Sequence, residues 1–416
     1  MTSPAAPRTF PLRLFLFAFF GWTFDFYDLV LLGFLKDAVG KDLHLTGAEE
    51  SLMLGVALGA SGLGGILFGM LADRFGKRSM LAVTIGIYSL GSLLSGLAPS
   101  LGWFLAARAI VGIGVGGEWA IGHGMLAEAV PANMRGRASA ALQAGEPLGA
   151  ALAAFAGFVL IPIVGWRAVM VGSSATALLA LFARRSLHLP AQPAATARPS
   201  LAELRGAGIA SRMVRAWVLG VLKLGTYWTC YTWLPSFLAR DMHQGVGRSL
   251  TWMLTAQSGQ LAGMLTFGLV SDRLGRRPAF SAYSLITACG IYPLAFHWQY
   301  LSAHPPLFWG AMLLLGFGSG CTAGFGALLA ELFPTEIRGE AMGATYNLAR
   351  TAQLLAPILV HQMVVRHGLS GGLSVPLVLA VATATWVWVL PETKGIALPS
   401  LRRLPPSPKA DEASAD

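Results

Sequence analysis

The sequence predicts an all-helical membrane protein in which twelve transmembrane helices form two pseudo-symmetric bundles of six. Three observations support this fold class: the composition, the number of apolar segments and an internal repeat. Of the 416 residues, 55% are hydrophobic and only 12% are charged, and the mean hydropathy is +0.60. Because a soluble domain carries about 25% charged residues, this chain needs lipid rather than water around most of its surface.

The apolar segments have the length that a membrane requires. A bilayer core of about 30 Å is crossed by about 20 apolar residues in a helix. Strands are not expected, because the segments lack alternation and an open sheet edge cannot be satisfied in lipid. Twelve helices are predicted to begin near Leu12, Ser51, Ser79, Leu101, Arg137, Arg167, Met213, Leu250, Pro278, Pro306, Gly339 and Leu373.

One polar stretch, rich in proline, alanine and arginine, interrupts the apolar segments and divides the chain. We therefore expect a first six-helix bundle in residues 1–183, a cytoplasmic linker in 184–212 and a second bundle in 213–392. The remaining residues, 393–416, form a polar tail that contains proline, and its end is typical of disorder.

The distribution of charge predicts the orientation. Most of the 30 lysine and arginine residues lie in alternate loops and in the two terminal segments, which places both termini in the cytoplasm of a bacterial inner membrane. The net charge of +10 does not indicate nucleic-acid binding, since that needs a basic face on a soluble domain.

The three cysteines, Cys230, Cys289 and Cys321, lie far apart in apolar segments. No CxxC or Cys/His cluster occurs, so we expect no metal and no disulfide framework. The sequence also shows no constellation of nucleophile, metal or cofactor ligands. We therefore expect no cofactor and no enzymatic activity.

Two motifs occur twice. The segment GMLADRFGKRS at 69–79 is echoed by GLVSDRLGRRP at 268–278, and AEAVPANMRG at 127–136 is echoed by AELFPTEIRG at 330–339. The six-helix unit is thus repeated, and transporters built from two such halves bind substrate near the bilayer midplane between them.

These motifs resemble a known family. The loop at 69–79 resembles the signature loop of the major facilitator superfamily, and RAIVGIGVGGEW at 108–119 resembles its fourth-helix motif. PETKG at 391–395 is similar to an ending common among sugar and metabolite porters. FDFYD at 24–28 and GGEW at 116–119 look most like the proton symporters for sialate, lactate and other metabolite acids. The resemblance implies a monomeric secondary transporter that works by alternating access.

The repeated loops combine glycines with charged residues at helix ends. Such a cluster can hold one half against the other in one state and release it in the other, although simple anchoring by positive charge is the alternative. The residues that we expect to take part in gating are Gly69, Asp73, Arg74, Gly76, Arg78, Arg108, Asp272 and Arg273.

Four carboxylates lie inside predicted spans, where a charge costs roughly 2.5–3.5 kcal/mol. They are the candidates for proton coupling: Asp25, Asp28, Glu118 and Glu146. Asp25 and Asp28 share one face of the first helix because they are three residues apart, and Asp28 is slightly preferred. The alternative for each is an ion pair that stabilises the bundle.

The second half supplies basic, aromatic and amide groups at a similar depth. Arginine can bind a carboxylate through two hydrogen bonds, and lysine adds a second positive charge. The candidate substrate-binding residues are Lys223, Tyr227, Tyr231, Gln257, Tyr346, Asn347 and Arg350.

Acidic groups in one half and basic groups in the other predict the uptake of a small organic acid together with protons. Two alternatives stay open. A proton-coupled sugar or neutral-metabolite porter would also end in PETKG, but it would not need Lys223 and Arg350. A drug/proton antiporter would show a complete fifth-helix motif, of which Gly145, Glu146 and Pro147 form only a part.

Overall fold

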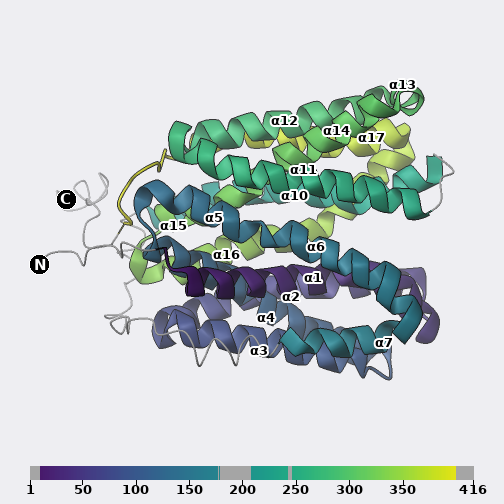
Figure 1. Ribbon diagram of the computed structural model, residues 1–416, viewed down its shortest axis with the longest axis horizontal. Coiled ribbons are helices and arrows are strands. Elements are labelled where there is room, and N and C mark those ends of the chain that lie inside the picture. Colours follow the sequence, from purple (N-terminus) through teal and green to yellow (C-terminus); the bar gives the residue numbers. More distant parts are fainter. Residues whose placement is uncertain (1–9, 177, 179–207, 242–245, 400–416) are drawn as a thin grey trace, which may run out of the picture.

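The structure is a computed structural model that describes residues 10–176, 178, 208–241 and 246–399. Every regular element in these ranges is a helix. Figure 1 shows two groups of long helices that lie side by side, and the described chain begins and ends at one end of the molecule. We call that end the terminal face and the opposite end the far face.

The helices of the first half are α1 (Leu12–Asp42), α2 (Gly47–Phe75), α3 (Lys77–Gly96), α4 (Leu101–Ala129), η1 (Ala132–Met134), α5 (Arg135–Gln143), α6 (Gly145–Phe155), the π-helical turn η2 (Ala156–Leu160), α7 (Ile161–Ser173) and η3 (Ser174–Thr176). The helices of the second half are α10 (Ile209–Asp241), α11 (Val246–Leu274), α12 (Arg276–Phe296), α13 (Trp298–Ala303), α14 (Pro305–Ser319), η4 (Gly320–Gly324), α15 (Phe325–Leu332), η5 (Thr335–Ile337), α16 (Arg338–Thr351), η6 (Ala352–Leu355), α17 (Ala356–Trp386) and η7 (Val387–Val389).

Two of these helices each hide a bend that separates two passes. In α7 the backbone turns at Gly165, whose φ is 79°, so the fifth pass ends there and the sixth begins. In α17 the chain folds back near Gly371. The evidence is a close contact with a residue eight positions earlier: a Cβ on Gly371 would lie 2.5 Å from the carbonyl oxygen of Met363. With these bends counted, the described helices belong to twelve passes, of which the sixth is described only as far as Leu178. Seven of them meet the length and hydropathy of a membrane span by themselves.

Helix starts follow local capping. The first and fourth helices begin at Leu12 and Leu101, as predicted. The second begins at Gly47 rather than near Ser51, because Thr46 and Glu49 form a capping box that starts the helix one turn earlier. The first helix of the second half, α10, begins at Ile209, inside the predicted linker 184–212, most of which lies outside the described residues.

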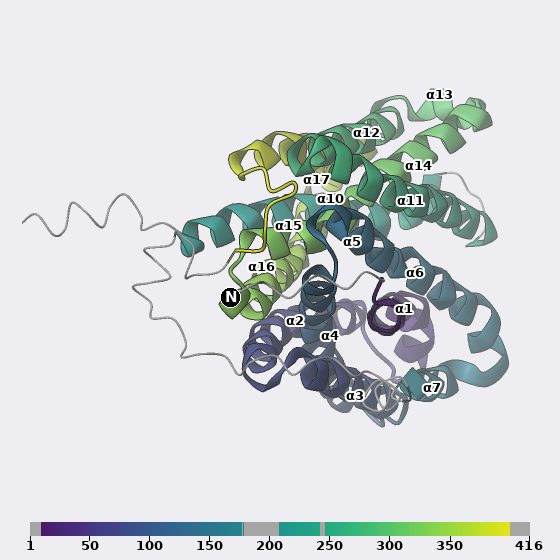
Figure 2. The ribbon, with the colours of Figure 1, turned by 60° about the vertical axis from the view of Figure 1, so that its left-hand side comes forward.

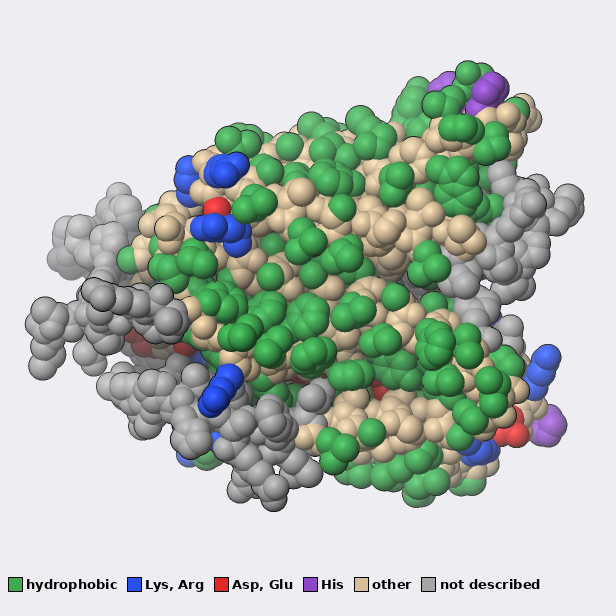
Figure 3. Space-filling view, viewed as in Figure 1, with side chains coloured by type: hydrophobic (Ala, Val, Ile, Leu, Met, Phe, Trp, Pro, Cys, Tyr) green, Lys and Arg blue, Asp and Glu red, His purple; other side chains and the backbone are tan. Residues whose placement is uncertain are grey.

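The outer surface is apolar, as expected of a protein in lipid. Figure 3 shows hydrophobic side chains along the flank of the bundles, while lysine and arginine side chains gather toward the two ends. Large side chains such as Leu63, Ile163 and Val378 are exposed by 68%, 74% and 63%. In water such exposed apolar groups would promote aggregation, whereas lipid solvates them.

The halves contact each other along two helix pairs, α2 with α16 and α5 with α11, and Figure 2 shows both pairs between the bundles. A Cβ on Gly69 would lie 2.6 Å from the carbonyl oxygen of Gly339, and one on Gly62 would lie 2.6 Å from the Thr351 hydroxyl. Seven residues of helix span about 10 Å. Over that depth, counted from the terminal face, α2 and α16 of the two halves are therefore closely packed.

Candidate functional site

Two polar regions lie between the halves. One is at the terminal face, where four carboxylates bridge helix ends: Asp73, Glu128, Asp272 and Glu331. We call these residues and their partners the terminal clasp. The other lies deeper and contains the buried charges of five helices: Asp25, Glu118, Glu146, Lys223 and Arg350. We call it the central cluster.

The terminal clasp contains two equivalent bridges between the halves. Asp73 at the end of α2 accepts hydrogen bonds from the backbone N–H groups of Gly339 and Glu340, at 3.3 and 3.1 Å. These groups form the first turn of α16, in the other half. A helix N-terminus favours a negative charge, so Asp73 holds α16 against α2.

Asp272 makes the matching bridge at the end of α11. It accepts hydrogen bonds from the backbone N–H groups of Gly136 and Arg137 at the start of α5, both at 3.0 Å. The loops that follow the two aspartates turn at Gly76 and Gly275, with φ of 90° and 111°. Residues with a Cβ avoid such values, which explains the glycine in each copy.

Two glutamates extend the clasp. Glu128 accepts hydrogen bonds from Lys77 and from Arg338 of the other half, both at 2.5 Å. Glu331 binds Arg276 through two hydrogen bonds of 2.9 and 3.1 Å. We did not predict either glutamate as a site residue. The signal was present, because both stand at the same position of the second repeated motif.

Not every predicted gating residue belongs to the clasp. The guanidinium of Arg74 lies over the neighbouring Phe75 ring, 5.2 Å from its centroid. Arg273 contributes its main-chain oxygen, which accepts a hydrogen bond from Lys394. Arg78 is half-buried near the start of α3. Gly69, Asp73, Gly76 and Asp272 are the predicted residues that shape the contact between the halves, and their gating role stays a prediction.

Arg108 and Asp28 form a buried ion pair inside the first half. Arg108 Nη1 lies 2.5 Å from Asp28 Oδ1, and Ser92 donates a hydrogen bond to the other carboxylate oxygen. The pair joins α4 to α1, so Arg108 lies away from the clasp. Both of these partners of Asp28 lie in its own half.

In the central cluster, Asp25 of α1 and Glu118 of α4 lie within hydrogen-bonding reach of each other. Both are buried, and none of their four oxygens has a hydrogen-bond donor among the described residues. Two carboxyl groups in contact repel each other unless a proton lies between them. This pair can therefore hold a proton.

Two cations of the second half belong to the same cluster. The guanidinium of Arg350 lies over the rings of Trp22 and Tyr346, 5.6 and 5.3 Å from their centroids. It interacts electrostatically with Asp25. Lys223 is 1% exposed, and neither its Nζ nor Arg350 Nη1 has a hydrogen-bond partner among the described side chains and backbone. These two donors could bind an anion.

Glu146 of α6 connects the halves through amides. Its two oxygens accept hydrogen bonds from Gln143 Nε2 at 2.6 Å and from Gln260 Nε2 of α11 at 2.9 Å. The oxygen of Gln143 in turn accepts a hydrogen bond of 3.0 Å from Trp119 Nε1. A chain of hydrogen bonds thus runs from α4 across the interface to α11.

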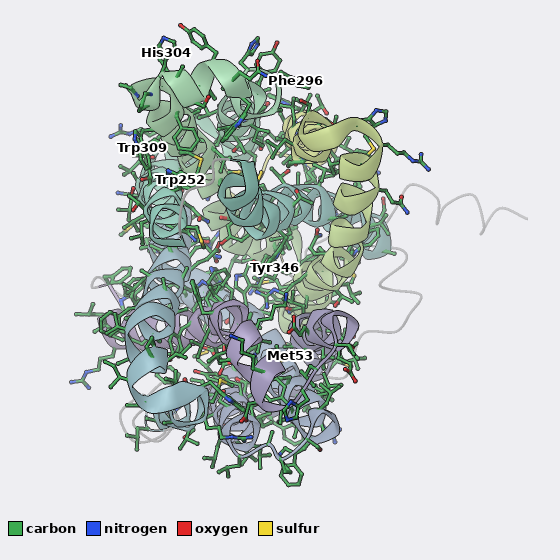
Figure 4. All side chains as sticks on the ribbon, turned by 90° about the vertical axis from the view of Figure 1, so that its right-hand side faces the viewer. Met53, Trp252, Phe296, His304, Trp309 and Tyr346 are labelled. Carbon is green, nitrogen blue, oxygen red and sulfur yellow. The ribbon has the colours of Figure 1, made fainter. Side chains whose placement is uncertain are left out.

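Aromatic contacts complete the cluster. The rings of Trp119 and Tyr346 stack across the interface with centroids 3.7 Å apart and planes 7° apart. Figure 4 shows Tyr346 in the middle of the molecule, between the two bundles. Phe26 and Tyr227 meet edge to face at 6.4 Å. Asn347 donates a hydrogen bond of 2.7 Å to the main-chain oxygen of Gly116.

The structure brings most of the predicted binding residues together. Gln257 lies on α11 one turn from Gln260, with a buried side-chain oxygen that has no donor in the described part of the chain. The side chain of Tyr231 lies outside the described ones. Trp22, Trp119 and Gln143 were not predicted. Only Trp119 carried a signal, as the last residue of GGEW.

Comparison with known proteins identifies the class to which this fold and site belong. The family model of the Major Facilitator Superfamily matches residues 14–247 and 245–412 of this sequence, so the chain belongs to that superfamily. The predicted family, the twelve-helix fold in two bundles and the absence of enzymatic function are confirmed, because the superfamily and the relatives are multi-pass membrane transporters.

Similar proteins include a putative metabolite transport protein of Haemophilus influenzae, 31% identical over 91% of this chain and 95% of the relative. A probable 4-methylmuconolactone transporter of Cupriavidus pinatubonensis is 30% identical over 95% of both chains. A sialic acid transporter of Escherichia coli is 30% identical over 86% of this chain and 89% of the relative. The solved structure of a proton:xylose symporter has a TM-score of 0.76 at 20% identity and covers 95% of this chain and 99% of the symporter, which shows a shared fold.

Proposed function

We propose that this chain carries a small organic acid into the cell together with a proton. The observation that supports this proposal best is the composition of the central cluster. Arg350 of one half interacts electrostatically with Asp25 of the carboxyl pair in the other half. Both Arg350 and Lys223 interact with Glu146 of that half. The relatives support the same class of substrate, since sialic acid and 4-methylmuconolactone each carry one carboxylic acid group.

The two sets of charges would divide the work. Arg350 offers a planar fork that suits a carboxylate, and Lys223 adds a compact positive charge. The carboxyl pair would accept the proton that accompanies the anion. The rings of Trp22 and Tyr346, whose centroids lie 5.6 and 5.3 Å from the guanidinium, would restrict the directions in which it can bind.

The orientation is part of the proposal. The described chain begins and ends at the terminal face, and because lysine and arginine concentrate in the loops expected on that side, we propose that this face lies in the cytoplasm of an inner membrane. With the clasp closed, the cluster is shielded on that side by about 10 Å of packed α2 and α16. Substrate would then reach Arg350 from the far face, and opening of the clasp would release it inside. We expect a monomer to complete this cycle.

The test is uptake by the purified protein in liposomes with an imposed pH gradient. Sialic acid and 4-methylmuconolactone are compared with their neutral carboxamides. We expect wild type to accumulate one or both acids and neither amide. Arg350→Ala should cost about 2–5 kcal/mol in acid binding, the range for removing one partner of a buried charge pair. Arg350→Lys should recover only part of the loss.

Arg167→Ala is the matched control, because it removes an arginine that pairs with Asp42 and donates to the main-chain oxygen of Ala98, and it leaves the central cluster unchanged. If Arg350→Ala lowers uptake of an acid and its amide equally, Arg350 does not bind the carboxylate. Accumulation of xylose instead of the acids would favour a sugar porter.

A further inference from the structure

We propose that Glu146 stays ionised throughout transport, as the fixed counter-charge of Arg350 and Lys223, and thereby makes each monocarboxylate enter with one proton. This inference rests on the proposed function. It assigns different roles to carboxylates that the sequence grouped together as proton carriers. Asp25 and Glu118 exchange the proton, and Glu146 does not.

The first argument is the direction of the hydrogen bonds at Glu146. The oxygen of Gln143 accepts from the indole N–H of Trp119, which can only donate. The amide nitrogen of Gln143 must therefore face Glu146, at 2.6 Å. With the Gln260 amide also donating, as the structure has it, a protonated carboxyl group would present its own O–H to a donor on at least one side, and it would fit only if the Gln260 amide turned over. The ionised form, which only accepts, fits this site.

The second argument is the set of groups that face Glu146. Arg350 of α16 and Lys223 of α10 both attract it electrostatically, and no ion pair within 4.0 Å satisfies either cation among the described residues. Tyr346 of α16 and Gln260 of α11 supply polar neighbours. Burial of Glu146 favours its neutral form, and these two cations together with the two amide donors counter that cost and favour the ionised form.

The third argument is the total charge of the cluster. Arg350 and Lys223 carry two positive charges. Glu146 carries one negative charge, and a carboxyl pair that shares one proton carries another, so the cluster is neutral. An added monocarboxylate would leave one uncompensated charge inside the membrane, which is costly. One further proton on Asp25 or Glu118 removes that charge. Transport of one anion with one proton then moves no net charge.

Infrared difference spectroscopy tests the ionisation of Glu146 directly and needs no substrate. Spectra of the protein in liposomes are recorded at a series of pH values from neutral down to about pH 5, where exposed carboxylates with ordinary pKa values near 4 stay ionised, and the carbonyl stretch of protonated carboxyl groups is followed. Asp25→Asn or Glu118→Gln should remove intensity from this band. Glu146→Gln removes one negative charge from the cluster, so the band should appear at lower pH but keep its components, and the control Glu49→Gln, in which an exposed capping box is preserved, should change neither. Loss of a component of the band in Glu146→Gln overturns the inference.

Transport supplies a second measurement, which does not depend on a variant that may misfold. In wild type, uptake of sialic acid or 4-methylmuconolactone should follow the pH gradient and be unaffected by a potential imposed with potassium and valinomycin. A current or a dependence on potential would overturn the one-to-one count.

In Glu146→Gln the anion should bind at least about tenfold more tightly, because one like charge has been removed nearby. Weaker or unchanged binding would also contradict the proposal.

The two proposals fail differently. If neither acid is taken up in a pH gradient, the proposed function is wrong for these substrates, and the infrared result still decides the ionisation of Glu146. If the acids are accumulated but a component of the protonated band comes from Glu146, the function stands and the fixed counter-charge is wrong.

Discussion

The terminal clasp and the central cluster differ in how their charges are satisfied. In the clasp, Asp73, Asp272 and Glu331 each accept at least two hydrogen bonds. In the cluster, the side-chain oxygens of Asp25 and the Nζ of Lys223 have no such partner among the described residues. Buried polar groups normally have partners. A region with its partners in place stabilises one conformation, whereas a region without them is suited to a ligand.

The same difference separates two residues on one helix. Asp25 and Asp28 stand three residues apart on α1, yet Asp28 is bonded to Arg108 and Ser92. Only Asp25 lies beside a second carboxyl group, that of Glu118. The sequence slightly favoured Asp28 as the proton carrier, whereas the geometry favours Asp25. The roles of both residues remain predictions.

The largest effect is expected from Asp25→Asn. We expect this variant to equilibrate an acid substrate across the membrane without accumulating it in a pH gradient, because one carboxyl of the proton-holding pair is gone. Asp28→Asn should instead act on stability, costing about 3–5 kcal/mol by leaving Arg108 buried without its partner. Uptake and thermal unfolding of both variants separate the two effects. Normal accumulation by Asp25→Asn would remove it from the mechanism.

A smaller effect is expected at the clasp. Asp73→Asn and Asp272→Asn each remove a charge from a helix N-terminus in the opposite half, which should cost up to about 2 kcal/mol. A free-energy change of about 1–2 kcal/mol shifts the equilibrium between the closed and the open clasp by a factor of about 5–30. We therefore expect slower turnover with little change in substrate affinity. If either variant loses affinity at a normal turnover rate, the clasp and the cluster are not separate.

The smallest effect is expected from Glu392→Gln. Burial raises the pKa of Glu392, but hydrogen bonds from four backbone N–H groups outweigh it, and the pKa lies below the ordinary value of 4.5. A lowered pKa stabilises the folded state above the unfolded value, and the gain is lost as pH falls through the folded one. The side chain is exposed, so we expect less than about 1 kcal/mol.

Thermal unfolding of wild type and Glu392→Gln should therefore differ slightly at neutral pH and converge as the medium becomes more acidic than pH 4.5. A difference that grows on acidification would contradict the hydrogen-bonding account.

The sequence could predict the fold because its signals are local or repeated. Apolar segments, glycines at loop turns and the duplicated motifs gave the number of helices and the two halves. The observed helix starts differed from the predicted ones where a short capping signal, such as Thr46 with Glu49, lay ahead of the apolar segment. The bends at Gly165 and near Gly371 show that the passes follow the turns of the chain rather than unbroken helix.

The site was harder to predict, because the hydrogen-bond and ion-pair partners of each residue depend on which helices pack against one another. Charge alone could not distinguish Asp25 from Asp28, since their difference lies in Arg108, eighty residues further along the chain. Gln143 carried no signal, because its importance comes from Trp119 on one side and Glu146 on the other. The position of Glu128 opposite Arg338 could have been found by comparing the two repeats residue by residue.

The stack of Trp119 on Tyr346 has a use in the laboratory. The two rings belong to different halves and lie 3.7 Å apart, so any movement that separates the halves at this depth must change the surroundings of one indole. Among the 12 tryptophans of the chain, Trp119 is thus a natural optical reporter. The difference in emission between wild type and Trp119→Phe would follow the alternation of the transporter in real time, with no dye attached.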